Sequence, residues 1–419
     1  MFTILMAALA LAPRALLDEV VASSPEVAQA RAAVMAERAR VPAASALPDP
    51  TLSLGMTNER FDAITLGQSE MSNVSIALSQ PLPWPGKRDL RGQVASLDEK
   101  RADAALRRAV LDAEARANRA YVQLALARGQ LELLADQEQL WMQAGRAARA
   151  RYEAGQAPQS DLLRAQIERA RLQQKKRALQ ADADTALAEL NRLRARPFDE
   201  ALPTPGLADA PEPQLPAESD AQADAQQRSP ELQLAMLGAA QSQKRADLAH
   251  RERYPDFAVS AAVMPRGSLP AMWQVGVSVG LPFFSGLRAA DGMHDRVESE
   301  SKAADAVKQQ LRLRTHERLL ALAALADNNR RYRGELLVLS AATARSALAQ
   351  YEAGRLPFSV VLDALTGYVA DRTSFLESLA GALLVSVAQQ QLSLDSAAAA
   401  PAPQAPTPSS APARSMNGM

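Results

Sequence analysis

The sequence has no cysteine, only three histidines, and few aromatic residues, which make up 4% of its 419 residues. Without cysteine the chain can form neither a disulfide nor a thiolate metal site, and it has no cysteine for N-terminal lipidation. The histidines, His250, His294 and His316, are too few and too scattered to suggest a metal cluster. The sequence therefore predicts no metal site and no cofactor.

An excess of either charge is also missing. Lys and Arg together number 47, as do Asp and Glu, so the formal net charge is zero. Proteins that bind nucleic acid usually carry a basic excess, so a nucleic-acid partner is not expected. The sequence contains no phosphate-binding glycine loop, nucleophile elbow or metal-ligand spacing. We therefore expect no catalytic residue and no enzymatic activity.

Long apolar runs are absent as well. Residues 1–12 are apolar but too short to span a bilayer, which takes about 20 residues. They resemble the apolar core of a signal peptide with Ala8-Leu9-Ala10 as a cleavage site, although the basic start is missing; the alternative is the start of a buried helix. We interpret residues 1–19 as a signal-like segment. Any crossing of a membrane must then use strands.

What the sequence does contain is an internal duplication. Tyr152-Glu153-Ala154-Gly155 recurs as Tyr351-Glu352-Ala353-Gly354, at an offset of 199 residues. Three more blocks recur in the same order: 24–26 with 229–231, 48–49 with 255–256, and 82–83 with 281–282. These matches predict two repeats, 20–196 and 228–393. The Pro-rich connector 197–227 is expected to be irregular, and the Ala/Pro/Ser-rich tail 394–419 to be disordered.

Each repeat predicts a helix followed by two strands. A Ser-Pro-Glu helix start opens the repeat, and apolar residues then alternate with small or polar ones. Leu52, Leu54 and Met56 form one such series, and Val275 and Val277 belong to another. The alternative is a half-buried sheet on a soluble core. The opposite face carries small, uncharged residues, which favours membrane strands.

A proline-free stretch follows each hairpin, at 88–151 and at 288–350. Helices of that length indicate coiled-coil packing rather than a globular domain. Gly155 and Gly354 suit the left-handed position that ends such a helix, and Pro158 and Pro357 begin a return helix to about residue 193 or 392. The predicted repeat is helix, β-hairpin, long helix, turn and helix.

Four strands cannot stand alone in lipid, because their open edges would leave backbone groups unsatisfied. Two copies supply eight strands, too few for a channel, and three supply twelve. The predicted fold class is therefore mainly α with a β-barrel part. It consists of a trimeric 12-stranded membrane barrel and an α-helical periplasmic tunnel.

The duplicated plan, the paired Tyr-x-x-Gly turns and the segment 80–88, Gln-Pro-Leu-Pro-Trp-Pro-Gly-Lys-Arg, resemble the TolC family of outer-membrane efflux proteins. The segment is similar to that of the heavy-metal branch, of the cobalt-zinc-cadmium and copper-silver type. The resemblance implies a homotrimer in the outer membrane of a Gram-negative bacterium, in contact with outer-membrane lipid and with a periplasmic helical stalk. It also implies a periplasmic adaptor (membrane fusion) protein and an inner-membrane efflux pump of the resistance-nodulation-division class.

The resemblance further implies that the turns with Tyr152 and Gly155, and with Tyr351 and Gly354, lie at the periplasmic tip and contact the adaptor. In the family, acidic residues just beyond these turns line the closed entrance. The acids found there are Asp161 in the first repeat and Asp363 in the second. Three copies would form carboxylate rings that attract cations. The alternative for either residue is a solvated or N-terminal helix position.

The two acids are not equivalent positions, since Val360 matches Asp161 and Arg164 matches Asp363. The expected function is a passive channel-tunnel of a tripartite efflux system that exports heavy-metal cations. A drug-efflux or type I secretion duct would share the architecture. A periplasmic coiled-coil adaptor or scaffold would also use long helical hairpins, but it predicts strands with charged outer faces, which the sequence does not have.

Overall fold

The computed structural model describes residues 12–204, 206–207, 215–282 and 292–394. These residues are mainly helical, with four strands in one antiparallel sheet. The chain divides into two compact units. The helical unit comprises residues 1–24, 110–228 and 311–419, and the strand unit comprises 25–109 and 229–310.

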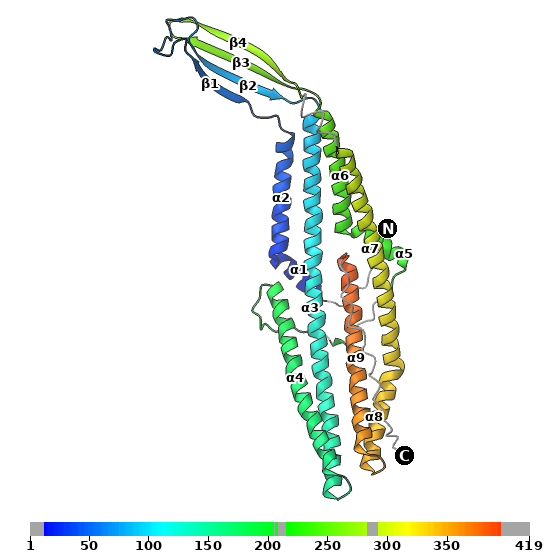
Figure 1. The fold of residues 1–419 in the computed structure, drawn as a ribbon. Coiled ribbons are helices and arrows are strands. Elements are labelled where there is room, and N and C mark those ends of the chain that lie inside the picture. Colours follow the sequence, from blue (N-terminus) through cyan, green and yellow to red (C-terminus); the bar gives the residue numbers. More distant parts are fainter. Residues whose placement is uncertain (1–11, 205, 208–214, 283–291, 395–419) are drawn as a thin grey trace, which may run out of the picture. The chain divides into compact units, whose positions relative to one another are not determined.

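The sheet lies in the strand unit, and its strands follow one another in chain order (Figure 1). β1 (Thr51–Thr57) pairs with β2 (Asn73–Leu82), and β3 (Asp256–Arg266) pairs with β4 (Leu269–Gly280), each as an antiparallel hairpin. β2 also pairs with β3, which joins the strands of the two repeats. The four predicted strands are confirmed, and among the described residues β1 and β4 are the edges of the sheet.

One face of the sheet carries an exposed apolar row. Leu54 pairs with Ile76, Ile76 with Val263, and Val263 with Trp273, so the four side chains lie side by side across the strands. Their exposed fractions are 73%, 44%, 52% and 78%. A soluble monomer rarely leaves so continuous an apolar surface open, so this face is suited to contact with lipid or another protein.

Two helices pack beside the start of the first long helix in the strand unit (Figure 1). α3 (Lys87–Glu153) is a single helix of 67 residues. α2 (Pro25–Ser45) contacts it through the 2.8 Å ion pair of Arg38 with Glu99, and α6 (Pro230–Arg251) through the 2.7 Å pair of Arg108 with Glu231. Ser229 caps α6 by accepting the N–H of Leu232, as the Ser-Pro-Glu start predicts.

The second long helix is continuous over 293–352 but contains one π-helical turn, which the prediction of a helix over 288–350 did not include. α7 (Met293–Arg331) and α8 (Leu337–Glu352) are separated by the π-helical turn η2 (Tyr332–Leu336), which contains Gly334. Glycine favours an α-helix less than other residues do, and the wider turn brings Tyr332 to 5.9 Å from Phe375 of α9, ring centre to ring centre.

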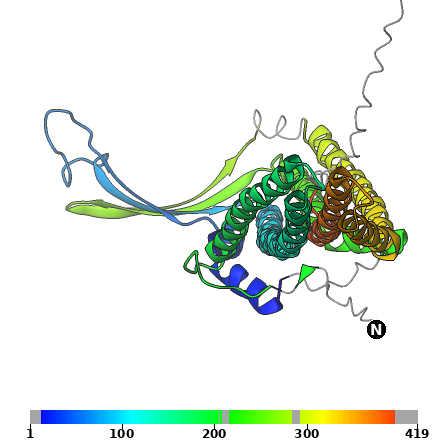
Figure 2. The same ribbon diagram turned by 90° about the horizontal axis from the view of Figure 1, so that it is seen from below.

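The return helices are confirmed in the helical unit. α4 (Gln159–Leu193) lies beside the second half of α3, and α9 (Phe358–Gln391) lies beside α8 (Figures 1 and 2). Alanine lets these helices approach closely, so a core forms with few aromatic side chains. One core cluster consists of Ala115, Val122, Ala125, Leu133, Leu207, Phe375, Leu376, Leu379, Ala380, Leu383 and Val387.

Two further helices belong to the helical unit. α1 (Arg14–Ser23) occupies part of the signal-like segment. α5 (Glu218–Arg228) lies in the connector 197–227, so the expected irregular structure was wrong there; its buried Ala221 and Ala225 stand one turn apart and give the helix an apolar stripe. Residues 1–11 of the signal-like segment, residues 395–419 of the tail and residues 283–291 lie outside the described residues.

Candidate functional site at the helix turns

Both long helices end in the same hydrogen-bonded turn. Gly155 has a φ of +68° and Gly354 a φ of +75°, in the left-handed region that disfavours other residues. Each glycine N–H donates to the carbonyl of the tyrosine three residues earlier, at 2.9 Å. The next N–H donates to the carbonyl before that tyrosine, at 2.7 Å in the first turn and 2.8 Å in the second. This is the Schellman arrangement, and it confirms the two predicted left-handed turns.

Tyr351 joins the two repeats. Its side chain is only 1% exposed, and its hydroxyl donates to Oδ2 of Asp161, in the first turn of α4, at 3.3 Å. Arg151, in the last turn of α3, donates to the Tyr351 carbonyl oxygen at 2.9 Å. The guanidinium carbon of Arg151 also lies 4.6 Å from the centre of the Tyr351 ring. The first repeat therefore contacts Tyr351 at its hydroxyl, its ring and its backbone.

A buried cluster surrounds this tyrosine. Phe358, in the first turn of α9, meets the Tyr351 ring edge-on with ring centres 5.3 Å apart. The cluster consists of Trp141, Ala144 and Ala148 of α3, Ala165 of α4, Ala344, Leu348 and Tyr351 of α8, and Phe358, Val361 and Leu365 of α9. The two helix hairpins are thus packed against each other directly beside their turns.

Burial raises the pKa of Tyr351 to about 12, with a further rise from the negative charge of Asp161 and from the hydrogen bond to it. The positive charge of Arg151 acts in the opposite direction. The phenol therefore keeps its proton far above neutral pH and remains a hydrogen-bond donor to the carboxylate.

The matching tyrosine of the first repeat is in a different environment. Tyr152 is 43% exposed, and its hydroxyl bonds to no residue that the structure describes. The offset of 199 residues places Val360, 39% exposed, where the first repeat has Asp161. The duplication is therefore broken at the turns, with one tyrosine bonded within the chain and the other on the surface.

The two predicted acids have different surroundings. Asp161 is half-buried beside Tyr351, whereas Asp363 is exposed on α9 and pairs with no residue in the described part of the chain. The structure thus brings Asp161 together with a tyrosine rather than with Asp363. Sequence reasoning missed Arg151. A difference between the two repeats could have pointed to Arg151. This arginine precedes the first Tyr-Glu-Ala-Gly block, whereas Gln350 precedes the second.

The segment 80–88 forms the corner between β2 and α3. Lys87 is 3% exposed, and its Nζ lies 2.7 Å from Oδ1 of Asp256 and 2.8 Å from the Tyr254 carbonyl oxygen. The Trp84 ring stacks on Tyr254, with ring centres 5.2 Å apart. These contacts fasten the start of α3 to the start of β3.

Gly86 completes this corner. Its φ of +87° favours glycine, and a Cβ there would lie 2.5 Å from Nη1 of Arg251. That same Nη1 donates to the Pro85 carbonyl oxygen at 3.0 Å. The Trp-Pro-Gly-Lys sequence therefore has a structural role at the junction of hairpin and helix.

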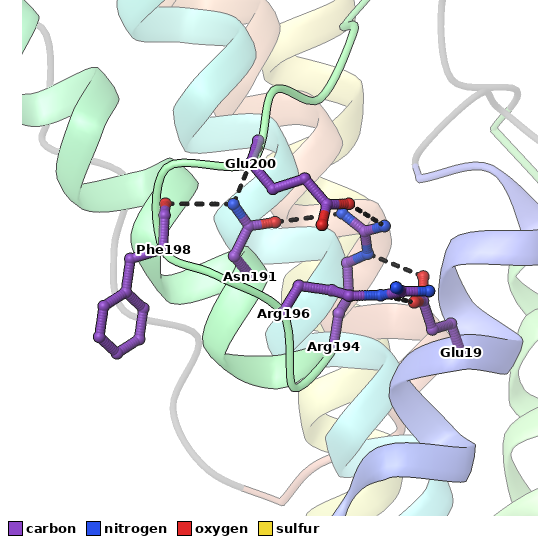
Figure 3. Close-up of polar contacts among 6 residues, drawn as sticks. All are labelled: Glu19, Asn191, Arg194, Arg196, Phe198 and Glu200. Carbon is purple, nitrogen blue, oxygen red and sulfur yellow. Dashed lines mark hydrogen bonds and ion pairs between the residues drawn. The ribbon is translucent and has the colours of Figure 1, made fainter.

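A second polar cluster fastens α1 to the end of α4 (Figure 3). Glu19 accepts from Nε of Arg194 at 2.8 Å and from Nε of Arg196 at 2.7 Å, and these bonds hold the pKa of its carboxyl below the usual value. Asn191, which is fully buried, donates to the carbonyl oxygens of Phe198 at 3.1 Å and Glu200 at 2.9 Å. The cluster fixes the path by which the chain leaves α4.

Within the described ranges, no group of three or more histidine and acidic side chains is placed to hold a metal ion. No described helix combines the length and the apolar character that a bilayer crossing requires.

Comparison with known proteins gives a family match over part of the chain. The outer membrane efflux protein family matches residues 16–195, a range close to the predicted first repeat, 20–196. No curated protein sequence matches the chain.

Solved structures share the fold over most of the chain. The outer-membrane channel OprN matches with a TM-score of 0.75 at 18% identity, covering 90% of this chain and 89% of OprN. CusC, a protein described for its folding and transmembrane channel formation, gives 0.76 at 16% identity over 90% and 91%. The outer membrane protein VceC from Vibrio cholerae gives 0.75 at 16% identity over 90% and 95%. The chain therefore has the fold of these outer-membrane channel proteins.

Proposed function

We propose that the chain is one subunit of a trimeric outer-membrane channel of the TolC family. It conducts cargo passively, without catalysis, in a tripartite system with a periplasmic adaptor and an inner-membrane pump. The exposed apolar row Leu54–Ile76–Val263–Trp273 is the observation that carries this proposal. The family match over 16–195 and the shared fold support it.

The edges of the sheet explain the need for several copies. The outward backbone groups of β1 and β4 need hydrogen-bond partners in lipid. If β4 of one copy pairs with β1 of the next, three copies close a ring of twelve strands that has no edge. The apolar row then faces the acyl chains. The alternating small residues, such as Ser75 and Gly276, face the lumen.

The turns form the entrance in this proposal, and the helical unit forms the periplasmic tunnel. The bond between Tyr351 and Asp161 holds the α8–α9 turn against the α3–α4 turn, and opening requires this contact to break. Asp363 is exposed on α9, so three copies would present three carboxylates that attract cations. The turns at Tyr152, Gly155 and Gly354 contact the adaptor.

The proposed cargo is heavy-metal cations. The support is the resemblance of the segment 80–88 to the heavy-metal branch, together with the exposed carboxylate of Asp363. A drug-efflux or type I secretion duct is the second candidate, because the structural role of Trp84 to Lys87 is compatible with any cargo. A periplasmic scaffold is disfavoured by the exposed apolar row.

Growth of a strain that lacks this gene tests the cargo. We expect reduced tolerance to zinc, cadmium, cobalt or copper, restored by the wild-type gene but not by a Leu54→Asp/Val277→Asp variant, whose charges would face lipid. Unchanged metal tolerance with lost antibiotic resistance would contradict the metal assignment and favour the drug-efflux candidate.

A further inference from the structure

A surface hollow lies at the foot of the sheet, within the strand unit. The end of α6 meets the start of α3 there, at the point where the chain passes between strand and helix in both repeats (Figure 1). The hollow has a volume of about 940 Å³, and small-molecule sites in proteins usually measure roughly 300–1,000 Å³. It is therefore large enough to hold the polar part of a small ligand.

The wall of the hollow nearest the sheet is aromatic. The Trp84 ring stacks on Tyr254 and also on Phe257 of β3, with ring centres 5.2 Å and 5.7 Å apart. Phe257 is an even number of residues from Val263 along β3, so the two side chains point to the same face of the sheet. Val263 belongs to the exposed apolar row. The aromatic stack therefore lies at the foot of the apolar face.

Two arginines with unused N–H groups line the same hollow. Nη1 of Arg251 donates to the Pro85 carbonyl oxygen at 3.0 Å, which orients the guanidinium, and its Nε and Nη2 bond to no residue in the described ranges. Gly86 leaves room for this guanidinium, since a Cβ there would lie 2.5 Å from Nη1. Arg253 is exposed and has no ion-pair partner among the residues described. Paired guanidiniums of this kind bind phosphate oxygens.

Two aspartates balance these charges. Asp89 accepts a hydrogen bond from Gln93 at 2.7 Å, and Asp247 accepts one from Gln243 at 3.1 Å. Asp247 also lies 3.7 Å from Nζ of Lys244, an ion pair that is open to solvent. A simple anion does not suit a hollow that holds as many carboxylates as guanidiniums. The arrangement fits a ligand that carries a phosphate and a cation together.

We propose that the hollow binds the headgroup of a phospholipid with a primary ammonium, of the ethanolamine class; this rests on the proposed function, which places the sheet in a membrane. The phosphate bonds to the two arginines and the ammonium to the two aspartates. The acyl chains run along the apolar face beside Phe257 and its pairing partner Val279. Aromatic side chains gather at membrane boundaries, and basic side chains there bind headgroups.

The charges of the hollow predict an order of preference among lipids. A glycerol headgroup has the phosphate but no cation, so Asp89 and Asp247 repel its net negative charge. A choline headgroup has a cation without N–H groups, so it can only be attracted to the carboxylates and cannot donate to them. We expect the ethanolamine lipid to bind most tightly, the choline lipid less tightly and the glycerol lipid least.

Native mass spectrometry of the solubilised, delipidated full-length trimer tests this order. The three phospholipids, with identical acyl chains, are added in turn and the bound copies are counted. We expect the ethanolamine lipid to saturate at one copy per chain. Arg253→Ala should weaken its binding about fivefold, the upper range for a partly exposed ion pair. Arg245→Ala, at an exposed arginine of α6 that does not line the hollow, should leave binding unchanged.

A second variant separates recognition from a merely structural effect. Asp89→Asn/Asp247→Asn keeps the size of both side chains and their oxygen acceptors for the two glutamines. It should weaken binding of the ethanolamine lipid and strengthen binding of the glycerol lipid, which reverses their order. A variant that loses all three lipids equally would show that the aspartates only hold the corner together, and this would overturn their assignment to the ammonium.

Three other outcomes are decisive. Equal retention of the three lipids by the wild type and by Arg253→Ala would mean bulk lipid contact only, which overturns the inference. Displacement of the bound lipid by excess inorganic phosphate would assign the arginines to a free anion and would also overturn it. A trimeric channel that binds no ethanolamine lipid would overturn only the inference, whereas the absence of any trimer in the outer-membrane fraction would contradict the proposed function itself.

Discussion

The hydroxyl of Tyr351 lies 3.3 Å from Oδ2 of Asp161, which ties the end of a helix from the second repeat to the start of a helix from the first. The contact lies beside a buried cluster and next to both left-handed turns. In the proposed channel it is the joint that keeps the two turns of one subunit together.

Tyr351→Phe keeps the ring and removes only the hydroxyl. We expect the tip to be destabilised by about 1.5–3 kcal/mol, the contribution of a hydrogen bond to a charged group, and the leak current in planar bilayers to rise. Tyr152→Phe is the matched control, because the Tyr152 hydroxyl has no partner among the described residues. Equal effects of the two variants would contradict the assigned joint.

Replacing the acids separates their two roles. Asp161→Ala leaves the buried Tyr351 hydroxyl without its acceptor, so leak current should rise as in Tyr351→Phe. Asp363→Ala removes an exposed carboxylate and should weaken block by divalent cations without loosening the turn. Conductance recorded with and without added divalent cations distinguishes the two. If neither variant changes leak or block, these residues are not part of the entrance.

The raised pKa of Tyr351 predicts an alkaline transition. A free tyrosine ionises near pH 10, so the stabilising contribution of protonated Tyr351 is complete below that pH. It is lost as the pH rises from about 10 towards about 12. The phenolate absorbance of the wild type minus that of Tyr351→Phe should therefore show one group titrating well above pH 10. A difference midpoint at the ordinary tyrosine value would refute the buried hydrogen bond.

Gly354 tests the second turn. Valine at a φ of +75° is strained, so Gly354→Val should distort the turn and reduce adaptor-dependent efflux while the trimer remains intact. Gly354→Asn is the control, because asparagine tolerates the left-handed region and preserves the backbone. Efflux by complemented cells and the mass of the solubilised oligomer measure the two effects. Full efflux by the valine variant would exclude this turn from the adaptor contact.

Ala195 is a site where stability can be gained. It has a φ of +55°, which is unfavourable for any residue with a Cβ, at the position after α4 where glycine is usual. Ala195→Gly should stabilise the helical unit by about 0.5–1 kcal/mol, seen as a higher thermal midpoint. A substitution to glycine at Ala170, exposed inside α4, should lower the midpoint instead. A lower midpoint for Ala195→Gly would show that the strain is not relieved.

Features with a local cause could be read from the sequence. The alternation at Leu52–Met56 reflects the two-residue period of a strand, and Gly155 and Gly354 are where the backbone requires a positive φ. The repeat supplied the order of the elements, because the matches keep nearly one offset. The predicted strands, turns and return helices therefore agree with the structure.

Features that depend on tertiary contacts could not be predicted from the sequence. The bond between Tyr351 and Asp161 joins residues 190 positions apart, and only the packing of the two hairpins brings them together. The contact of Tyr332 in η2 with Phe375 of α9 likewise joins residues far apart in the sequence. α5 was missed because its two buried alanines lie in a segment whose prolines and acids suggested a loop.

The most direct test of the channel proposal is the mass and conductance of the protein extracted from the outer-membrane fraction. The protein is purified in detergent, weighed by native mass spectrometry and inserted into planar bilayers. We predict three copies per particle and ohmic channels that appear only with the protein. A monomer that stays soluble without detergent and conducts no current would contradict the proposal.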